Sequence, residues 1–173
     1  MIEIVSARPC HVRAIAELVE PFAHHRVLVA KELISYFEDV QEFVVALDGE
    51  NVVGCGALHV MWEDIAEIRT LAVRPEEQGR GIGSRIYQAL EDRARELGLA
   101  RLFCLTFETD FFARAGFAPI EGTPVGKNVF NEMLRSHDEG LAEFLDLARV
   151  KPNTLGNTRM LKELTDDVLL EGD

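Results

Sequence analysis

Three glycines at alternate positions, Gly79, Gly81 and Gly83, lie between a strand-like run and a long helical pattern. Glycine lets the backbone turn tightly and approach a ligand closely at such a junction. Several backbone N–H groups then converge at the positive end of the following helix, which makes a local site for an anion, above all a phosphate. The junction therefore predicts a strand, a phosphate-binding turn and a helix, in that order.

Hydrophobic periodicity and turn residues predict the rest of the fold. Leu33, Ile34 and Phe37 are expected to face the core from one short helix, and Asp48-Gly49 is expected to form a hairpin turn. An antiparallel meander followed by strand, glycine loop, helix and strand is typical of an α+β fold. Strands are predicted over 2–7, 42–47, 52–61, 65–73, 101–107, 117–120 and 157–164, and helices over 9–22, 31–38, 82–97 and 109–115, with one or two more after Gly122.

Length and charge narrow the class of protein. A chain of 173 residues fits one domain, predicted over 1–165, with a frayed acidic tail over 166–173. It has no apolar run long enough to cross a bilayer and no basic, then apolar, N-terminus, so a cytoplasmic protein is expected. The net charge of −12 argues against nucleic acid or membrane as partners, because both attract clustered basic charge.

Cysteine and histidine residues give no metal signature. The three cysteines are an odd number without ligand spacing, and Cys55 and Cys104 lie in apolar runs typical of reduced core residues. The histidines lack i, i+4 pairing and flanking ligands, so no metal is predicted. The cysteines are Cys10, Cys55 and Cys104, and the histidines include His24, His25, His59 and His137.

The glycine loop lacks the Lys-Ser/Thr ending of a nucleotide P-loop and the Gly-x-Gly-x-x-Gly spacing of a dinucleotide site. The pattern Gln78-x-x-Gly81-x-Gly83 resembles instead the pyrophosphate-binding signature of GNAT N-acetyltransferases, and 111–117 resembles the second half of that pattern. Nearly the whole chain takes part in the resemblance. The runs 42–46, 54–58, 67–73, 101–106 and 151–161 look like those of N-acetylglutamate synthases, the last like the short stand-alone actinobacterial form.

The resemblance implies a GNAT fold with a mostly antiparallel mixed sheet of about six to seven strands flanked by helices. It implies acetyl-CoA as cosubstrate and the α-amino group of L-glutamate or, alternatively, L-glutamine as acceptor. Direct transfer in a ternary complex is expected, because it needs fewer assumptions than a route through a cysteine. That reaction would be the first step of arginine biosynthesis. Some relatives form homodimers, and the resemblance suggests the same oligomeric state for this chain. The implied cofactor-binding residues are Leu71, Ala72, Val73, Gln78, Gly79, Arg80, Gly81, Ile82, Gly83, Ser84 and Phe112.

Glu67 matches the general base of the family, which takes the proton of the acceptor ammonium; otherwise it is a strand glutamate paired with a cation. Arg69 lies on the same strand face, where it either clamps the substrate carboxylate or neutralises Glu67. The resemblance suggests Lys31 and Arg159 as further anchors for a carboxylate, and Arg26 is a candidate by its position. The alternative is that each is a solvated surface charge.

The aromatic residue at 112 departs from a common family pattern. Many GNAT enzymes have a tyrosine there that protonates the leaving thiolate, which Phe112 cannot do, although similar glutamate synthases also carry Phe. A water, Thr109 or direct departure of the thiolate would replace it. An alternative mechanism is transfer through Cys104 or Cys55. The alternative functions are a GNAT enzyme that acts on a protein N-terminus, polyamine or antibiotic, and a non-catalytic acetyl-CoA sensor.

Overall fold

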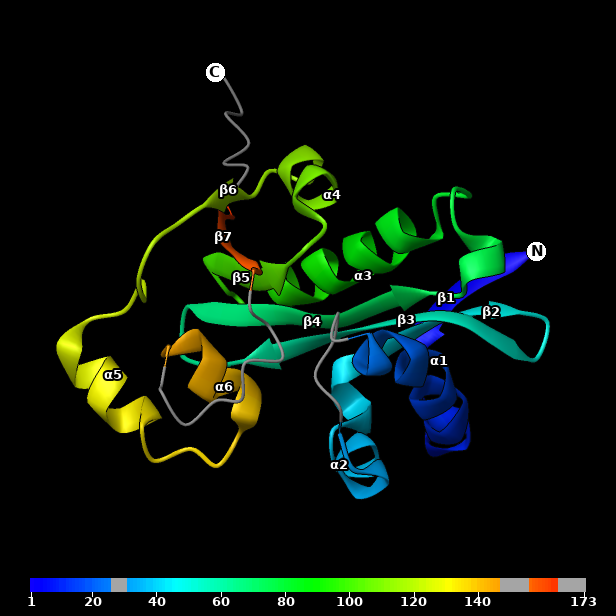
Figure 1. The fold of residues 1–173 in the computed structure, drawn as a ribbon, viewed down its shortest axis with the longest axis horizontal. Helices are drawn as coiled ribbons and strands as arrows, with labels where there is room; N and C mark the ends of the chain where they lie inside the picture. The colour runs from blue at the N-terminus through cyan, green and yellow to red at the C-terminus, as the bar shows by residue number, and fades with distance from the viewer. Residues whose placement is uncertain (26–30, 147–155, 165–173) are drawn as a thin grey trace, which may run out of the picture.

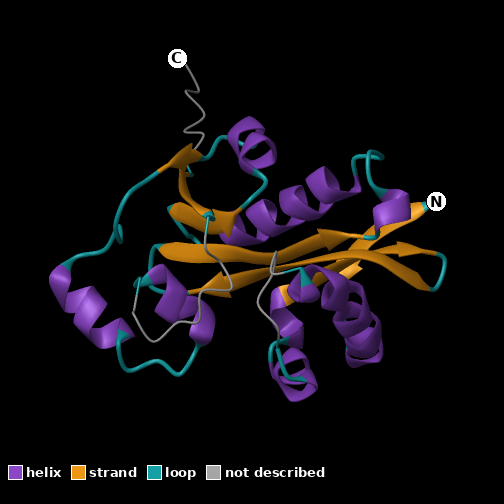
Figure 2. Cartoon of the chain, viewed as in Figure 1, coloured by secondary structure: helices purple, strands orange, loops and turns teal. Residues whose placement is uncertain are grey.

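A mixed seven-stranded β-sheet forms the centre of the protein, with helices on both faces (Figures 1 and 2). The computed structural model describes residues 1–25, 31–146 and 156–164. The strand order is β1-β2-β3-β4-β5-β7-β6, in which only β4 and β5 run parallel. This confirms the predicted α+β class and the mostly antiparallel sheet.

The elements follow the predicted order closely. The strands are β1 Ile2–Ser6, β2 Phe43–Asp48, β3 Asn51–Val60, β4 Ile65–Val73, β5 Arg101–Thr106, β6 Ala118–Pro119 and β7 Thr158–Glu163. The helices are α1 Val12–His24, α2 Leu33–Glu38, α3 Ile82–Glu96, α4 Thr109–Arg114, α5 Lys127–Met133 and α6 Glu139–Phe144, and single 3-10 turns cover Pro9–His11, Val40–Glu42 and Pro75–Glu77. Arg26, the run 151–153 and the tail 166–173 lie outside the described residues.

The buried face of α2 was predicted wrongly. Leu33, Ile34 and Phe37 are 36%, 62% and 37% exposed, whereas Tyr36 is 4% exposed and packs its ring 6.0 Å from that of Phe43. The helix is short, so a single side chain directed at the sheet is enough to set its orientation. The apolar content of the segment predicted a buried face without showing which side it was.

Helix α3 lies against the sheet on the face opposite α1 and α2 (Figure 1). Ile86 and Leu90 of α3 are fully buried there. A Cβ atom on Gly56 of β3 would lie only 2.8 Å from Cγ2 of Ile86, so the absence of a side chain allows the close approach of helix and strand. This packing fixes the N-terminus of α3 beside the end of β4.

Strands β4 and β5 are paired over only part of their length. Their pairing runs only from Ile65 opposite Arg101 to Glu67 opposite Phe103, although both strands continue. On its other edge β4 is bulged, because the register with β3 shifts between Cys55 and Ala57, and Thr70 has a φ of +58°. A gap therefore opens between the two central strands just beyond Glu67.

Helices α5 and α6 lie on the same side of the sheet as α1 and α2, towards the β4–β5 end (Figure 1). Phe144 of α6 is fully buried with its ring edge-to-face against Phe103, the centroids 4.9 Å apart. None of the described helices combines the length and the apolar character that a membrane crossing requires.

Candidate active site

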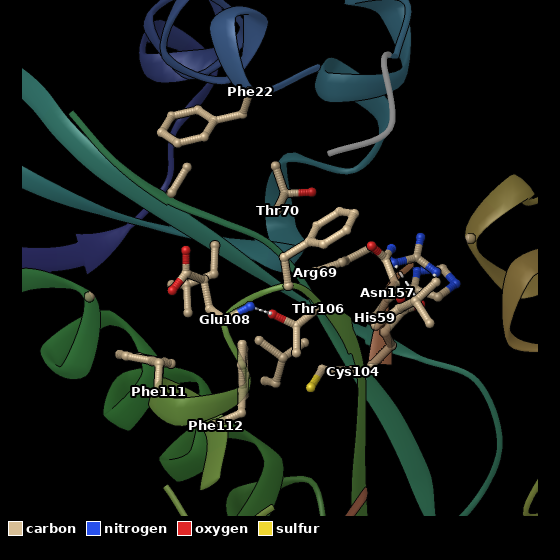
Figure 3. A pocket seen from close by; sticks show the side chains of 18 of the residues that line it. Phe22, His59, Arg69, Thr70, Cys104, Thr106, Glu108, Phe111, Phe112 and Asn157 are labelled. Carbon is tan, nitrogen blue, oxygen red and sulfur yellow. Dashed lines mark hydrogen bonds and ion pairs between the residues drawn. The ribbon is translucent and has the colours of Figure 1, made fainter. Parts of the chain in front are cut away.

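The gap between β4 and β5 leads into a cleft of about 1640 Å³. Ile68–Val73 of β4 and Cys104–Thr106 of β5 form its two walls, and residues from α2, α4, α6 and the glycine loop complete it. Figure 3 shows His59, Arg69 and Asn157 gathered on one side and Phe111 and Phe112 of α4 on the other. The cleft thus has a polar side and an aromatic side.

The glycine loop borders the cleft at the start of α3. Gly81 is the residue before the helix and has a φ of +74°, a conformation that favours glycine, and Gly79 has a φ of +79°. A Cβ atom at either position would meet no atom within 4 Å, so the backbone there borders open space. The Gln78 side chain donates to the carbonyl of Val73 at 3.3 Å, which ties the loop to β4. The predicted residues of this loop line the cleft except Arg80, whose guanidinium pairs with Glu77.

Glu67 lies at the last position where β4 pairs with β5 and is 7% exposed. Arg69 donates to Oε2 of Glu67 from Nε at 3.1 Å and from Nη2 at 2.9 Å. The same guanidinium donates from Nη1 and Nη2 to the two carboxylate oxygens of Asp138, at 3.1 and 2.9 Å. The pairing of Arg69 with Glu67 is therefore present, and a second carboxylate joins it.

Comparison with known proteins shows the family of this chain. Residues 11–117 match the acetyltransferase (GNAT) family. The chain belongs to the GNAT acetyltransferases. Acetyl-CoA is accordingly its cosubstrate, and the resemblance seen in the sequence is confirmed.

The relatives of this GNAT acetyltransferase include both short and long proteins. An amino-acid acetyltransferase of Mycobacterium tuberculosis is 56% identical over 90% of both chains. A crystal structure of an M. tuberculosis protein in complex with CoA superposes with a TM-score of 0.91, at 54% identity, and the match covers 94% of this chain and 99% of that one. An amino-acid acetyltransferase of Ralstonia nicotianae is 35% identical over 72% of this chain, which spans only 29% of that longer protein.

Charge explains how the Arg69 cluster is held. Burial alone would lower the pKa of the Arg69 guanidinium, but the charges of Glu67 and Asp138 outweigh it and raise this pKa. Burial likewise works to raise the pKa of Asp138, but hydrogen bonds and the charge of Arg69 lower it from 3.8 to about 2. Arg69 and Asp138 are thus both charged across the neutral pH range.

The depressed pKa of Asp138 predicts a pH dependence of stability. The folded value lies below the unfolded one, so the stabilisation is complete well above pH 3.8 and is lost as the pH falls through 2. It amounts to about 2 kcal/mol, of which about 1 kcal/mol should be gone at pH 3. Urea unfolding between pH 6 and pH 3 measures it, and Asp138→Asn should lack this component. Parallel curves for the two proteins would contradict the assignment.

On the aromatic side of the cleft, position 112 carries no hydroxyl group that could protonate the leaving thiolate. Phe112 is 5% exposed, lines the cleft and packs edge-to-face on Phe111 and Phe117. Cys104 also lines the cleft, but burial, with the charge of Glu67 adding to it, raises the pKa of this thiol. Burial raises the pKa of Cys55 to about 12. Neither thiol is ionised near neutral pH, as a nucleophilic cysteine needs to be.

The cationic candidates are placed differently. Lys31 lines the cleft, with its Nζ 3.6 Å from Oδ2 of Asp39. Arg159 is not among the described residues that line the cleft; its guanidinium donates to the carbonyls of Gly122, Glu143 and Phe144. It therefore satisfies carbonyl groups at the C-terminal end of α6.

The sequence does not assign His59, Asp138 or Asn157 to the cleft. His59 lies opposite Glu67 in the β3–β4 register, and its Nδ1 is 2.7 Å from Oε1 of Glu42 and its Nε2 3.9 Å from Oδ1 of Asp138. Asn157 lines the cleft with Oδ1 buried and no hydrogen-bond partner for it among the described residues. Counting outward from the predicted turn at 62–64 would have found His59, but no local pattern marks Asp138 or Asn157.

Among the described residues, no group of three or more His, Cys, Asp or Glu side chains is arranged to hold a metal ion.

Proposed function

We propose that this acetyltransferase transfers the acetyl group of acetyl-CoA directly to the α-amino group of a free amino acid, L-glutamate or L-glutamine. The observation that carries the proposal is Glu67, a buried carboxylate at the point where β4 and β5 separate. Both hydrogen bonds from Arg69 end on Oε2, so Oε1 stays available to accept a proton. The M. tuberculosis relative named amino-acid acetyltransferase supports the substrate class.

Glu67 acts as the general base. The amino group of a free amino acid is mostly an ammonium ion near neutral pH, and it attacks only after losing a proton. A carboxylate in the cleft attracts the ammonium ion and then takes the proton, directly or through one water. With the proton on Oε1, the opposite oxygen keeps its bonds to Arg69, so the side chain stays in place during the transfer.

The donor side is formed by main-chain groups. The amides at Gly79–Ser84 bind the phosphates, and the unpaired edge of Leu71–Val73 binds the arm that carries the acetyl group. Acetyl-CoA supplies an activated acetyl thioester there. Such contacts do not need a basic surface, which is consistent with the net charge of −12.

The charge of the cleft bears on the acceptor. Among the described lining residues the carboxylates outnumber the cations, so a second negative charge on the substrate is disfavoured by repulsion. This favours L-glutamine, which has an uncharged side chain, over L-glutamate. The carboxylates are Glu32, Glu38, Asp39, Glu67, Glu77, Glu108, Asp110, Asp138, Glu139 and Glu143, and the cations Lys31, Arg69 and Arg114.

A thiol-release assay with acetyl-CoA and a panel of acceptors tests the proposal. Glutamine or glutamate should release free CoA, and the product should be the N-acetyl amino acid by mass spectrometry. Turnover of peptides, polyamines or aminoglycosides alone would overturn the acceptor class. Tight acetyl-CoA binding without release for any acceptor would identify a sensor instead. With L-glutamate as the acceptor, the product is N-acetylglutamate, which we expect to enter arginine biosynthesis.

Direct transfer predicts that Cys104→Ala changes kcat by less than about threefold, because the buried thiol is protonated and takes no covalent part. Incubation with acetyl-CoA alone should also leave the wild-type mass unchanged. A covalent acetyl adduct that disappears in Cys104→Ala, together with loss of turnover, would instead establish a two-step route. Cys10→Ala, at an exposed thiol, is the matched control.

A further inference from the structure

Asp138 connects α6 to the catalytic strand. Its Oδ1 accepts the backbone N–H of Leu141 at 2.7 Å, which caps α6. The same carboxylate accepts two hydrogen bonds from Arg69, although 69 positions separate the two residues in the sequence. One side chain therefore determines both where α6 begins and where the guanidinium lies.

The guanidinium of Arg69 has little donor capacity left. Its two bonds to Glu67 and two to Asp138 use all but one of the five N–H donors of an arginine. A substrate carboxylate could be held in a bidentate fashion only if Asp138 or Glu67 gave up a hydrogen bond to Arg69. The geometry therefore favours a structural role for Arg69, which bridges two carboxylates, over a clamp on the substrate.

The first turn of α6 lies directly on this guanidinium. A Cβ atom at Gly140 would come within 2.6 Å of Nη2 and 2.7 Å of Cζ of Arg69. Glycine is therefore needed for α6 to cover the ion pair this closely. The Arg69 side chain is 8% exposed, while the Asp138 side chain is 25% exposed and lines the cleft.

We propose that Asp138 is a positioning residue for acetyl transfer: it locks Arg69, and through Arg69 it holds Glu67 with one oxygen fixed and the other ready to accept a proton. The inference rests on the proposed function of Glu67. Asp138 itself does not exchange a proton with the substrate. Its contribution depends on the Arg69 guanidinium and should vanish without it.

Asp138→Ser is the primary variant, because serine also caps helices but lacks the carboxylate that holds Arg69. It should lower kcat about 10- to 100-fold, the cost expected when a reacting group is displaced by about 1 Å. The KM values for acetyl-CoA and for the amino acid should change less than about threefold. Asp64→Ser is the matched control, since Asp64 binds Arg101 at 3.1 and 2.9 Å and does not line the cleft. It should leave kcat unchanged.

A double-mutant comparison separates action through Arg69 from direct contact with the substrate. In an Arg69→Gln background, Asp138→Ser should cause no further loss of kcat. An equal additional loss, a raised KM for the amino acid at constant kcat, or wild-type kinetics of Asp138→Ser would each overturn the proposal. Gly140→Ala should lower kcat in the same way with the carboxylate intact, because α6 is pushed off the guanidinium.

A measurement that needs no turnover keeps this inference distinct from the proposed function. The Nη1–H resonance of Arg69, from the group that donates to Asp138, should be protected from solvent exchange in the wild type and exchange rapidly in Asp138→Ser. Unchanged protection would show that Asp138 does not hold Arg69. Failure of the wild type to acetylate any amino acid would instead overturn the proposed function, whatever the resonance shows.

Discussion

Glu67→Gln should lower kcat by about 10²- to 10⁴-fold and leave the affinity for acetyl-CoA within about twofold. Glutamine preserves the size of the side chain and still accepts a bond from Arg69, but it has no carboxylate to take the ammonium proton. Steady-state thiol release measures kcat, and isothermal titration with acetyl-CoA measures binding. Glu163→Gln, at an exposed glutamate on β7, is the matched control and should behave as wild type.

The pH profile gives the decisive comparison. With Glu67 as the base, raising the pH should partly restore Glu67→Gln, because a larger fraction of the free amino acid is then already deprotonated. Wild-type kcat in Glu67→Gln would remove Glu67 from the proton transfer. A large loss of acetyl-CoA affinity in that variant would show instead that Glu67 supports the donor site.

Phe144→Ala should lower the free energy of unfolding by about 3–5 kcal/mol, the range for removing a fully buried phenylalanine ring. The ring is completely buried and packs on Phe103, which pairs with Glu67 across β4 and β5. Urea denaturation monitored by circular dichroism measures the loss. Phe37→Ala, at a ring that is 37% exposed, should cost about 1 kcal/mol or less.

The same substitution reports on the site. Because Phe144 anchors α6 and Asp138 caps it, a loosened α6 should also lower kcat. A destabilised but fully active Phe144→Ala would show that the position of α6 is unimportant for turnover. A change in stability of less than about 1 kcal/mol would contradict the packing itself.

Local signals were sufficient for the donor half of the protein. The strand ending at Val73, the three glycines and the amphipathic pattern of α3 follow one another within a single stretch, and the structure has them as predicted. Each of these signals is a short-range pattern in residue type or periodicity. The pyrophosphate-binding signature of the family lies in the same stretch, which is why it could be recognised before any tertiary contact was known.

The acceptor half depends on contacts that no local pattern encodes. Arg69 meets Asp138 across 69 positions, and whether an arginine clamps a ligand or bridges two carboxylates is decided by that distant partner. The side of α2 that is buried was likewise set by Tyr36 meeting Phe43 rather than by the hydrophobicity of Leu33 or Ile34. Sequence periodicity predicts elements, whereas long-range packing selects their orientation.

The separation of β4 and β5 gives the cleft two sides, which in the proposed function bind the acetyl donor and the amino-acid acceptor. In the proposed function, main-chain atoms between Leu71 and Ser84 bind the donor, whereas α5 and α6 belong to a segment inserted between β6 and β7. Mutations that reshape this segment can retune the choice of amine without rebuilding the thioester site. The fold thus permits acceptor preference to diverge among descendants that keep the same acetyl donor.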